Sequence, residues 1–127
     1  MLKKVLIIES DGLLNLRLAT TLIEGGFMVG RASSYHEALE KLDDFEPHII
    51  VTNESLSDKN GIEASLHLVN RRGIPTILVG NDCTDAAWSK LAESCADQYI
   101  KLPIVPKVFV ARVKAILRRY EKHRCAY

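Results

Sequence analysis

Three short, continuously apolar runs constrain the fold of this chain more than any other feature. Residues 4–8 (KVLII), 48–51 (HIIV) and 76–79 (TILV) are rich in branched aliphatic side chains and lack polar alternation. Such runs are typical of parallel strands that are covered on both faces. Residues 27–32 (FMVGRA) and 97–101 (DQYIK) are more polar, as edge strands are. The sequence therefore predicts a parallel sheet with a buried centre and two weaker edges.

Amphipathic patterns fill the intervals between these runs. In residues 34–42, Ser34 stands three places before Glu37, which is the spacing of a capping box at the start of a helix. The other predicted helices cover residues 13–26, 62–72, 84–94 and a segment that begins near Pro106. A helix after each strand predicts an α/β domain that is doubly wound, with right-handed crossovers.

Length and composition agree with one such domain. The chain has 127 residues, 47% of them hydrophobic, and no apolar stretch approaches the roughly 20 residues of a membrane span. We expect a cytoplasmic protein with a domain over residues 1–121 and a tail over 122–127 that begins a linker to an output domain. The three cysteines form no CxxC pair, which argues against a zinc site or a disulfide framework.

Charge is unevenly distributed along the chain. Residues 101–127 hold eight Lys/Arg against one acid, although the formal charge of the whole chain is +1. Basic residues favour the carboxyl end of a helix and often form a solvated or partner-facing surface. Direct nucleic-acid binding by this basic end is the alternative.

In a doubly wound sheet, binding sites form beyond the carboxyl ends of the strands, near the point where the strand order reverses. The residues at the predicted strand ends are therefore the candidates for function. They are Glu9, Ser10, Asp11, Asn53, Glu54, Gly80, Asn81, Asp82, Lys101, Leu102 and Pro103.

These segments resemble the receiver domain of bacterial two-component response regulators. VLIIESD is similar to the first strand with its acidic pair, PHIIVTNESLSDKNG to the third strand and phosphoacceptor loop, and IPTILVGN to the fourth strand. CADQYIKLP is similar to the segment that ends in Lys-Pro, and VARVKAILRR to the last helix of receivers joined to winged-helix DNA-binding domains. The resemblance covers residues 3–119 and implies a flavodoxin-like, chemotaxis-receiver-like fold. In that fold five parallel strands have the order 2-1-3-4-5 and are wound by five helices.

The resemblance also implies a chemistry. Receivers accept a phosphoryl group on an aspartate, hold Mg²⁺ with an acid pair, and contact the phosphoryl oxygens with a lysine and a Ser/Thr hydroxyl. At the acceptor position this chain has Asn53, whose amide lacks the charge and nucleophilicity of a carboxylate. Of the acid pair Glu9 is kept, while Ser10 stands at the second position. We therefore expect weak or absent metal binding.

Two more positions differ from the receiver pattern. Leu102 stands where a lysine precedes Pro103, and Gly80 stands at the hydroxyl position. Lys101 is one residue earlier than the usual lysine and is predicted to point away from the site, unless a cis bond before Pro103 redirects it. The departures together predict a pseudo-receiver with a degenerate phosphorylation pocket, which is no enzyme and needs no cofactor.

A module without this chemistry would act through its surface. In receivers the output face is formed by the fourth helix, the fifth strand and the fifth helix, and Tyr99 occupies the position of the switch aromatic. Asp97, Arg112 and Arg119 match positions that form ion pairs in receiver dimers, and Trp88 is a candidate anchor on the same face. We expect a protein partner or a homodimer there, nucleic acid only through an attached domain, and no membrane. For Tyr99 and Trp88, plain packing roles are the alternative.

Three other functions stay open. A working receiver could use a non-standard acid, Glu54 or Asp58, as the phosphoacceptor. A regulator could bind DNA through an attached output domain. A small α/β enzyme or nucleotide-binding domain is the weakest alternative, because no glycine-rich phosphate loop follows the first predicted strand.

Overall fold

The computed structural model describes residues 2–58, 63–64, 67–68, 72–81 and 98–125. Their elements follow one another in the chain as β1 (Lys4–Ile8), α1 (Gly12–Glu24), β2 (Met28–Ala32), α2 (Tyr35–Phe45), β3 (Ile49–Asn53), β4 (Thr76–Gly80), β5 (Gln98–Lys101) and α5 (Pro106–Cys125). All strand pairs are parallel, and the sheet order is β2-β1-β3-β4-β5. The predicted sheet and strand order are thus confirmed.

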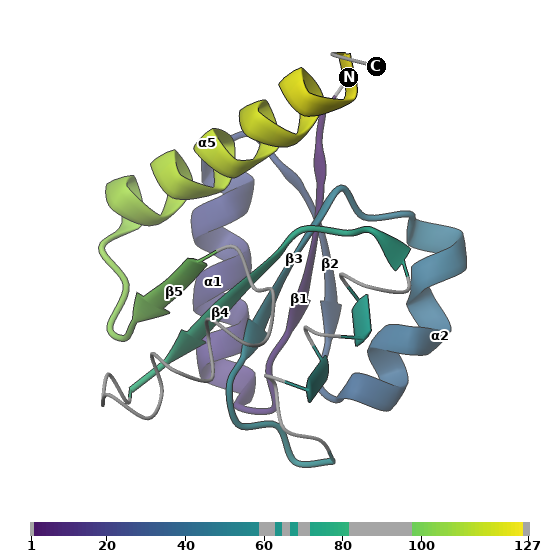
Figure 1. The fold of residues 1–127 in the computed structure, drawn as a ribbon. Helices are drawn as coiled ribbons and strands as arrows, with labels where there is room; N and C mark the ends of the chain where they lie inside the picture. Colours follow the sequence, from purple (N-terminus) through teal and green to yellow (C-terminus); the bar gives the residue numbers. More distant parts are fainter. Residues whose placement is uncertain (1, 59–62, 65–66, 69–71, 82–97, 126–127) are drawn as a thin grey trace.

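Alternate residues of the central strands supply two separate cores, one on each face of the sheet. Val5 and Ile7 of β1 face a core shared with α1 and α5, whereas Leu6 and Ile8 face a core shared with α2. All four side chains are completely buried. Figure 1 shows α1 and α5 on one face of the sheet and α2 on the other. Burial on both faces explains why β1 reads as a continuous apolar run.

Helix α5 contacts the first of these cores through the stripe that its sequence predicted. Phe109, Val113 and Ile116 are completely buried, and Tyr120 packs against the same core while partly exposed. The helix continues to Cys125, beyond the domain boundary predicted at residue 121. No helix in the described part of the chain has the length and apolarity to cross a membrane.

The start of α2 differs in detail from the predicted capping box. The Ser34 hydroxyl accepts the Glu37 main-chain N–H at 3.1 Å, as expected. The Glu37 carboxylate, however, accepts from Ser33, at 3.0 Å from its main-chain N–H and 2.7 Å from its hydroxyl, so the reciprocal bond forms one residue before the cap. These bonds, with that from Lys41, lower the pKa of Glu37 to about 2, because they favour the charged form.

The number of helices needs a correction for the described residues. Three continuous helices, α1, α2 and α5, are found there instead of five. The helix predicted over 62–72 lies partly outside the described residues, although those described at 63–64, 67–68 and 72 are helical. The helix predicted over 84–94, with Trp88, lies entirely outside them.

Candidate functional site

The strand ends meet at one edge of the sheet because the strands are parallel and in register. Ile8 pairs with Thr52, Asn53 pairs with Val79, and Gly80 pairs with Lys101. Each described site residue predicted at a strand end therefore follows or ends a strand of the sheet, whereas Asp82 lies outside the described residues. Strands β3 and β4 extend to Asn53 and Gly80, so these residues end their strands rather than follow them.

Glu9 is the buried carboxylate of this edge. Its side chain is 3% exposed, and its Oε1 atom accepts the main-chain N–H of Asp11 at 3.0 Å. Its Oε2 atom is buried and has no hydrogen-bond partner within the described part of the structure. Asp11 itself caps α1, since its Oδ1 accepts two main-chain N–H groups of the first turn, at 3.0 and 3.1 Å. Glu9 thus places a buried carboxylate directly after β1, at the carboxyl end of the sheet.

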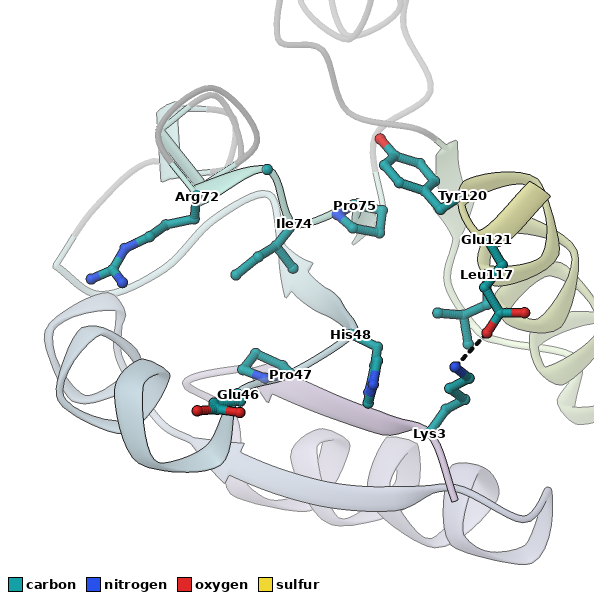
Figure 2. Close-up of a pocket in the computed structure, with 11 residues that line it drawn as sticks. Lys3, Glu46, Pro47, His48, Arg72, Ile74, Pro75, Leu117, Tyr120 and Glu121 are labelled. Carbon is teal, nitrogen blue, oxygen red and sulfur yellow. Dashed lines mark ion pairs between the residues drawn. The ribbon is translucent and has the colours of Figure 1, made fainter. Parts of the chain in front are cut away.

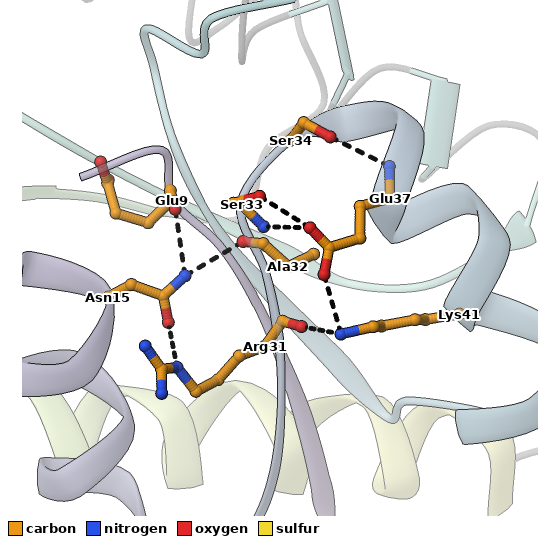
Figure 3. Close-up of polar contacts among 8 residues, drawn as sticks. All are labelled: Glu9, Asn15, Arg31, Ala32, Ser33, Ser34, Glu37 and Lys41. Carbon is orange, nitrogen blue, oxygen red and sulfur yellow. Dashed lines mark hydrogen bonds and ion pairs between the residues drawn. The ribbon is translucent and has the colours of Figure 1, made fainter. Parts of the chain in front are cut away.

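A buried amide beneath the site links β1, β2 and α1. The Asn15 Nδ2 atom donates to the carbonyl oxygens of Glu9 and Ala32, each at 3.0 Å, and its Oδ1 accepts from Arg31 Nε at 2.7 Å. Figure 3 shows this amide between the two strands, with Lys41 of α2 reaching the Arg31 carbonyl from the other side. Sequence reasoning missed Asn15, because a lone polar residue in a helix carries no signal of where it points.

Ser10 and Asn53 both bond to the loop that follows β3. The Ser10 hydroxyl accepts the Ser57 main-chain N–H at 3.1 Å and lies 3.3 Å from the Ser57 hydroxyl. The Asn53 Oδ1 atom accepts the Ser55 main-chain N–H at 2.9 Å, which closes a local turn. The Ser10 hydroxyl oxygen and the Asn53 amide oxygen therefore each accept a main-chain N–H group of the same loop.

Asp58 anchors the far end of this loop to α2. Its two carboxylate oxygens accept the main-chain N–H groups of Tyr35 and His36, each at 3.0 Å. The bonds from His36 and then Tyr35 lower the pKa of Asp58 below its ordinary value, because they favour the carboxylate. The sequence offers Asp58 as an alternative phosphoacceptor. In the structure its carboxylate lies against the first turn of α2 and accepts two of its main-chain N–H groups.

The space above Gly80 is filled by two other side chains. A β-carbon on residue 80 would lie 2.6 Å from the Tyr99 hydroxyl oxygen and closer still to the Glu54 carboxylate. Real β-carbons do not approach neighbours so closely. The absence of a side chain at Gly80 is therefore a steric requirement of this arrangement.

The adjacent side chains of Lys101 and Leu102, at the end of β5, lie in different environments. Lys101 is exposed, whereas Leu102 is partly buried and packs against the core shared by α1 and α5. The peptide bond between Leu102 and Pro103 is cis. Leu102 is thus a packing residue of this core.

Residues predicted for the output face are partly described. Arg112 and Arg119 are exposed on α5, and Tyr99 lies in β5 with its hydroxyl buried. Trp88 and Asp97 fall outside the described residues. Within the described part of the chain, neither Arg112 nor Arg119 forms an ion pair.

A cavity that the sequence did not predict lies at the opposite edge of the sheet. The cavity has a volume of about 240 Å³. Its lining residues come from the segments before β3 and β4 and from the end of α5 (Figure 2). Lys3 forms an ion pair with Glu121 at its rim, and the bond from Lys3 lowers the pKa of Glu121. The His48 Nδ1 atom accepts the Lys4 main-chain N–H at 3.0 Å at its floor. The predicted site residues do not line this cavity.

A metal site with several protein ligands finds no support in these contacts. Within the described ranges, no three His, Cys, Asp or Glu side chains gather in a group that could hold a metal ion. The described site instead contains the buried carboxylate of Glu9 and the exposed ammonium group of Lys101. Its two other side-chain oxygens, those of Ser10 and Asn53, already accept main-chain N–H groups.

Comparison with protein families and curated sequences gives consistent matches. The sequence profile of the response regulator receiver domain matches residues 5–114. The phosphate regulon transcriptional regulatory protein PhoB of Escherichia coli is 29% identical over 122 residues, which cover 94% of this chain and 53% of PhoB. The alkaline phosphatase synthesis transcriptional regulatory protein PhoP of Bacillus subtilis is 34% identical over 121 residues, covering 94% of this chain and 50% of PhoP. The chain thus spans about half the length of these relatives.

Solved structures have the same fold. A two-component response regulator from Clostridium difficile superposes with a TM-score of 0.86 at 28% identity, covering 93% of this chain and 98% of that one. A CheY-like response regulator receiver domain protein from Methanospirillum hungatei superposes with a TM-score of 0.88 at 24% identity, covering 97% and 99%.

Proposed function

Because this chain belongs to the response regulator receiver family, we propose that it is a receiver domain that signals without phosphorylation, by binding a protein partner or a second copy of itself. The observation that carries the proposal is Asn53 at the carboxyl end of β3, with its side-chain oxygen bonded to the Ser55 N–H. In the family this position carries the aspartate that takes the phosphoryl group. An amide oxygen there is too weak a nucleophile for that step.

The residues around Asn53 do not fit the Mg²⁺ ion of the family. Mg²⁺ prefers near-octahedral oxygen ligands and is usually held by carboxylates. Of the three positions concerned, Glu9 alone is a carboxylate, while the Ser10 and Asn53 oxygens accept main-chain N–H groups of the following loop. No step of the proposed function therefore involves a metal ion.

The groups that contact phosphoryl oxygens in receivers are also replaced. Leu102 packs against the core and has no charge to offer, and Gly80 has no hydroxyl. Lys101 is exposed beside the site, so it remains the one candidate cation among the proposed pocket residues. A transferring phosphoryl group requires preorganised positive charge. These replacements support the proposal that the pocket does not catalyse phosphoryl transfer.

The rival function, phosphorylation of a non-standard acid, has little support in the contacts of either candidate. Both Asp58 oxygens accept main-chain N–H groups of α2, so its carboxylate serves as a cap. The Glu54 carboxylate fills the space above Gly80 and is close to the Tyr99 hydroxyl.

The proposed output face comprises the helix predicted over 84–94, strand β5 and helix α5, with Trp88, Asp97, Tyr99, Arg112 and Arg119 as its interface residues. The exposure of Arg112 and Arg119 on α5 leaves two cations available to an acidic partner surface. The names of the relatives PhoB and PhoP support a place in transcription regulation. DNA binding would then belong to an attached output domain, since the chain spans about half of those relatives.

Incubation with acetyl phosphate and Mg²⁺, followed by intact-mass spectrometry, tests the proposal. We expect no phosphoryl adduct on this chain, while a receiver that retains the aspartate and the acid pair is labelled in the same reaction. An adduct that maps to any carboxylate of residues 1–121 would refute phosphorylation-independent signalling. Sedimentation at increasing concentration, with Arg112→Glu and Arg119→Glu as variants, then tests whether the output face joins two copies of the chain.

A further inference from the structure

Two helices on opposite faces of the sheet carry opposite charge. Helix α5 lies with α1 on one face, and α2 lies on the other (Figure 1). Within the described range, the exposed cations of α5 are Lys107, Arg112, Lys114, Arg118 and Arg119. The exposed acids of α2 are Glu40, Asp43 and Asp44. The molecule therefore has a basic helix on one side and an acidic helix on the other.

Three of the α5 cations form a basic stripe, which consists of Lys107, Lys114 and Arg118. These residues are seven and four positions apart, so they project from one side of the helix. Arg112 lies two residues from Lys114 and therefore projects from the other side of the exposed surface, together with Arg119. Within the described part of the chain, no residue of the basic stripe forms an ion pair. Its positive charge is thus available to an acidic surface.

The basic stripe borders a cleft between α5 and the end of α1. The cleft has a volume of about 330 Å³, and Lys114, Arg118 and Gly25 are among the residues that line it. Glu121 also lines the cleft, but its carboxylate is paired with Lys3. An acidic helix that lies along α5 can therefore place its side chains beside two cations that have no described carboxylate partner.

The outer side of α2 presents carboxylates with a matching spacing. Glu40 and Asp44 are exposed and four residues apart, so they lie one helical turn from each other. Asp44 has no ion pair among the described residues, and Glu40 contacts only the exposed ring of His36, at 3.2 Å. Lys114 and Arg118 are also four residues apart, which corresponds to about 6 Å along a helix. Two ion pairs can therefore form at once between the two helices.

We propose that α2 of one copy of this chain docks on the basic stripe of a second copy, with Glu40 and Asp44 opposite Lys114 and Arg118. Complementary charge favours this occupant, and the formal net charge of +1 leaves little overall repulsion between copies. The contact is weak, because exposed ion pairs each contribute little free energy. It joins two different surfaces on opposite faces of the sheet, so it is heterologous and can repeat from copy to copy.

Sedimentation equilibrium at increasing protein concentration measures this contact. Charges interact over about 30 Å in about 0.01 M salt, but over only about 3 Å in about 1 M salt. The weight-average mass of the unchanged chain should therefore rise with concentration in low salt, and high salt should remove this rise.

Two charge-reversed variants test the two surfaces separately. The basic-face variant combines Lys114→Glu with Arg118→Glu, and the acidic-face variant combines Glu40→Lys with Asp44→Lys. Each variant should self-associate at least about tenfold more weakly in low salt, because two attractive pairs become repulsive. An equimolar mixture of the two variants restores opposite charge at the contact. It should therefore regain the association, which would also show that both variants fold.

Arg112→Glu with Arg119→Glu is the matched control, since it changes the net charge equally on the other side of α5. This control should keep the salt-sensitive association. The proposal would be overturned by an unchanged chain that stays monomeric in low salt, by a basic-face variant that associates normally or no worse than the control, or by a mixture without recovery. The contact involves neither the phosphorylation pocket nor Arg112 and Arg119. A phosphoryl adduct in the acetyl phosphate experiment would therefore refute the proposed function and leave this contact standing.

Discussion

The Asp58 Oδ1 atom accepts the main-chain N–H of Tyr35, the first residue of α2, at 3.0 Å. Its second oxygen accepts the next N–H, that of His36, at the same distance. The first N–H groups of a helix have no partner within the helix, and a negative charge there also interacts favourably with the helix dipole. A loop residue thus completes the cap that Ser34 begins, and joins the loop after β3 to α2.

Asp58→Ala should destabilise the protein near neutral pH, since the start of α2 would lose both acceptors. The pKa of Asp58 is lower in the folded chain than its ordinary value of about 3.9. Its stabilising contribution is therefore complete above about pH 4 and is lost as the pH falls through the depressed value. Urea denaturation at pH 7 and pH 3 should show a clear difference between variant and parent at pH 7 that shrinks at pH 3. Asp44→Ala, an exposed acid on α2, is the control.

Asn53→Asp alone should not create a phosphorylatable receiver. The new carboxylate would lie beside Glu9, still without the second acid, the lysine or the hydroxyl that the reaction needs. Incubation with acetyl phosphate and Mg²⁺ followed by intact-mass spectrometry should leave this variant unlabelled. Efficient labelling would mean that one carboxylate suffices and that the other replacements matter little.

The melting temperature should be indifferent to millimolar Mg²⁺. In the proposed pocket, Ser10 and Asn53 stand where an ordinary receiver would crowd two further carboxylates beside Glu9, so we expect little repulsion for a cation to relieve. The double variant Ser10→Asp with Asn53→Asp restores that crowding and should melt at a lower temperature without Mg²⁺ and recover with it. Thermal unfolding with Mg²⁺ and with a chelator compares the two proteins, and a Mg²⁺-dependent rise in the parent would contradict the prediction.

Leu102→Lys should destabilise the protein instead of repairing the site. Leu102 packs against the core between the sheet, α1 and α5, and its partial burial makes a loss of about 1 kcal/mol reasonable. Urea denaturation measures the loss, with Val105→Lys as a control because Val105 is 61% exposed. Equal effects of the two substitutions would show that Leu102 contributes no particular packing.

Asn15→Ala should destabilise the protein by about 2 kcal/mol, because it removes the donor to two buried carbonyl oxygens and the acceptor for Arg31. The matched control is Thr20→Ala on the exposed side of α1, where the hydroxyl bonds to the Leu16 carbonyl. The free energy of unfolding from urea titration compares the two. A loss below about 0.5 kcal/mol for Asn15→Ala would place this amide among ordinary surface residues.

Much of the fold could be predicted from local sequence alone. The apolar run of residues 4–8 is buried on both faces, and the stripe with Phe109 and Val113 faces the core, because hydrophobic periodicity reports directly on burial. Ser34 could be predicted as a cap for the same kind of reason, since it acts on a residue three places away. The parallel order of the strands then placed Asn53 and Gly80 at one edge of the sheet.

Contacts between residues far apart in the chain could not be predicted in this way. The sequence offers Asp58 as a rival acceptor and gives no sign that its carboxylate caps a helix that begins 23 residues earlier. The filling of the space above Gly80 by Glu54 and Tyr99 depends on how three strands lie side by side and on which rotamers fit between them. Composition and periodicity determine which residues are buried and which strands form. The tertiary structure decides which polar groups then meet, because hydrogen bonds require positions within a few tenths of an ångström, which no pattern in the sequence specifies.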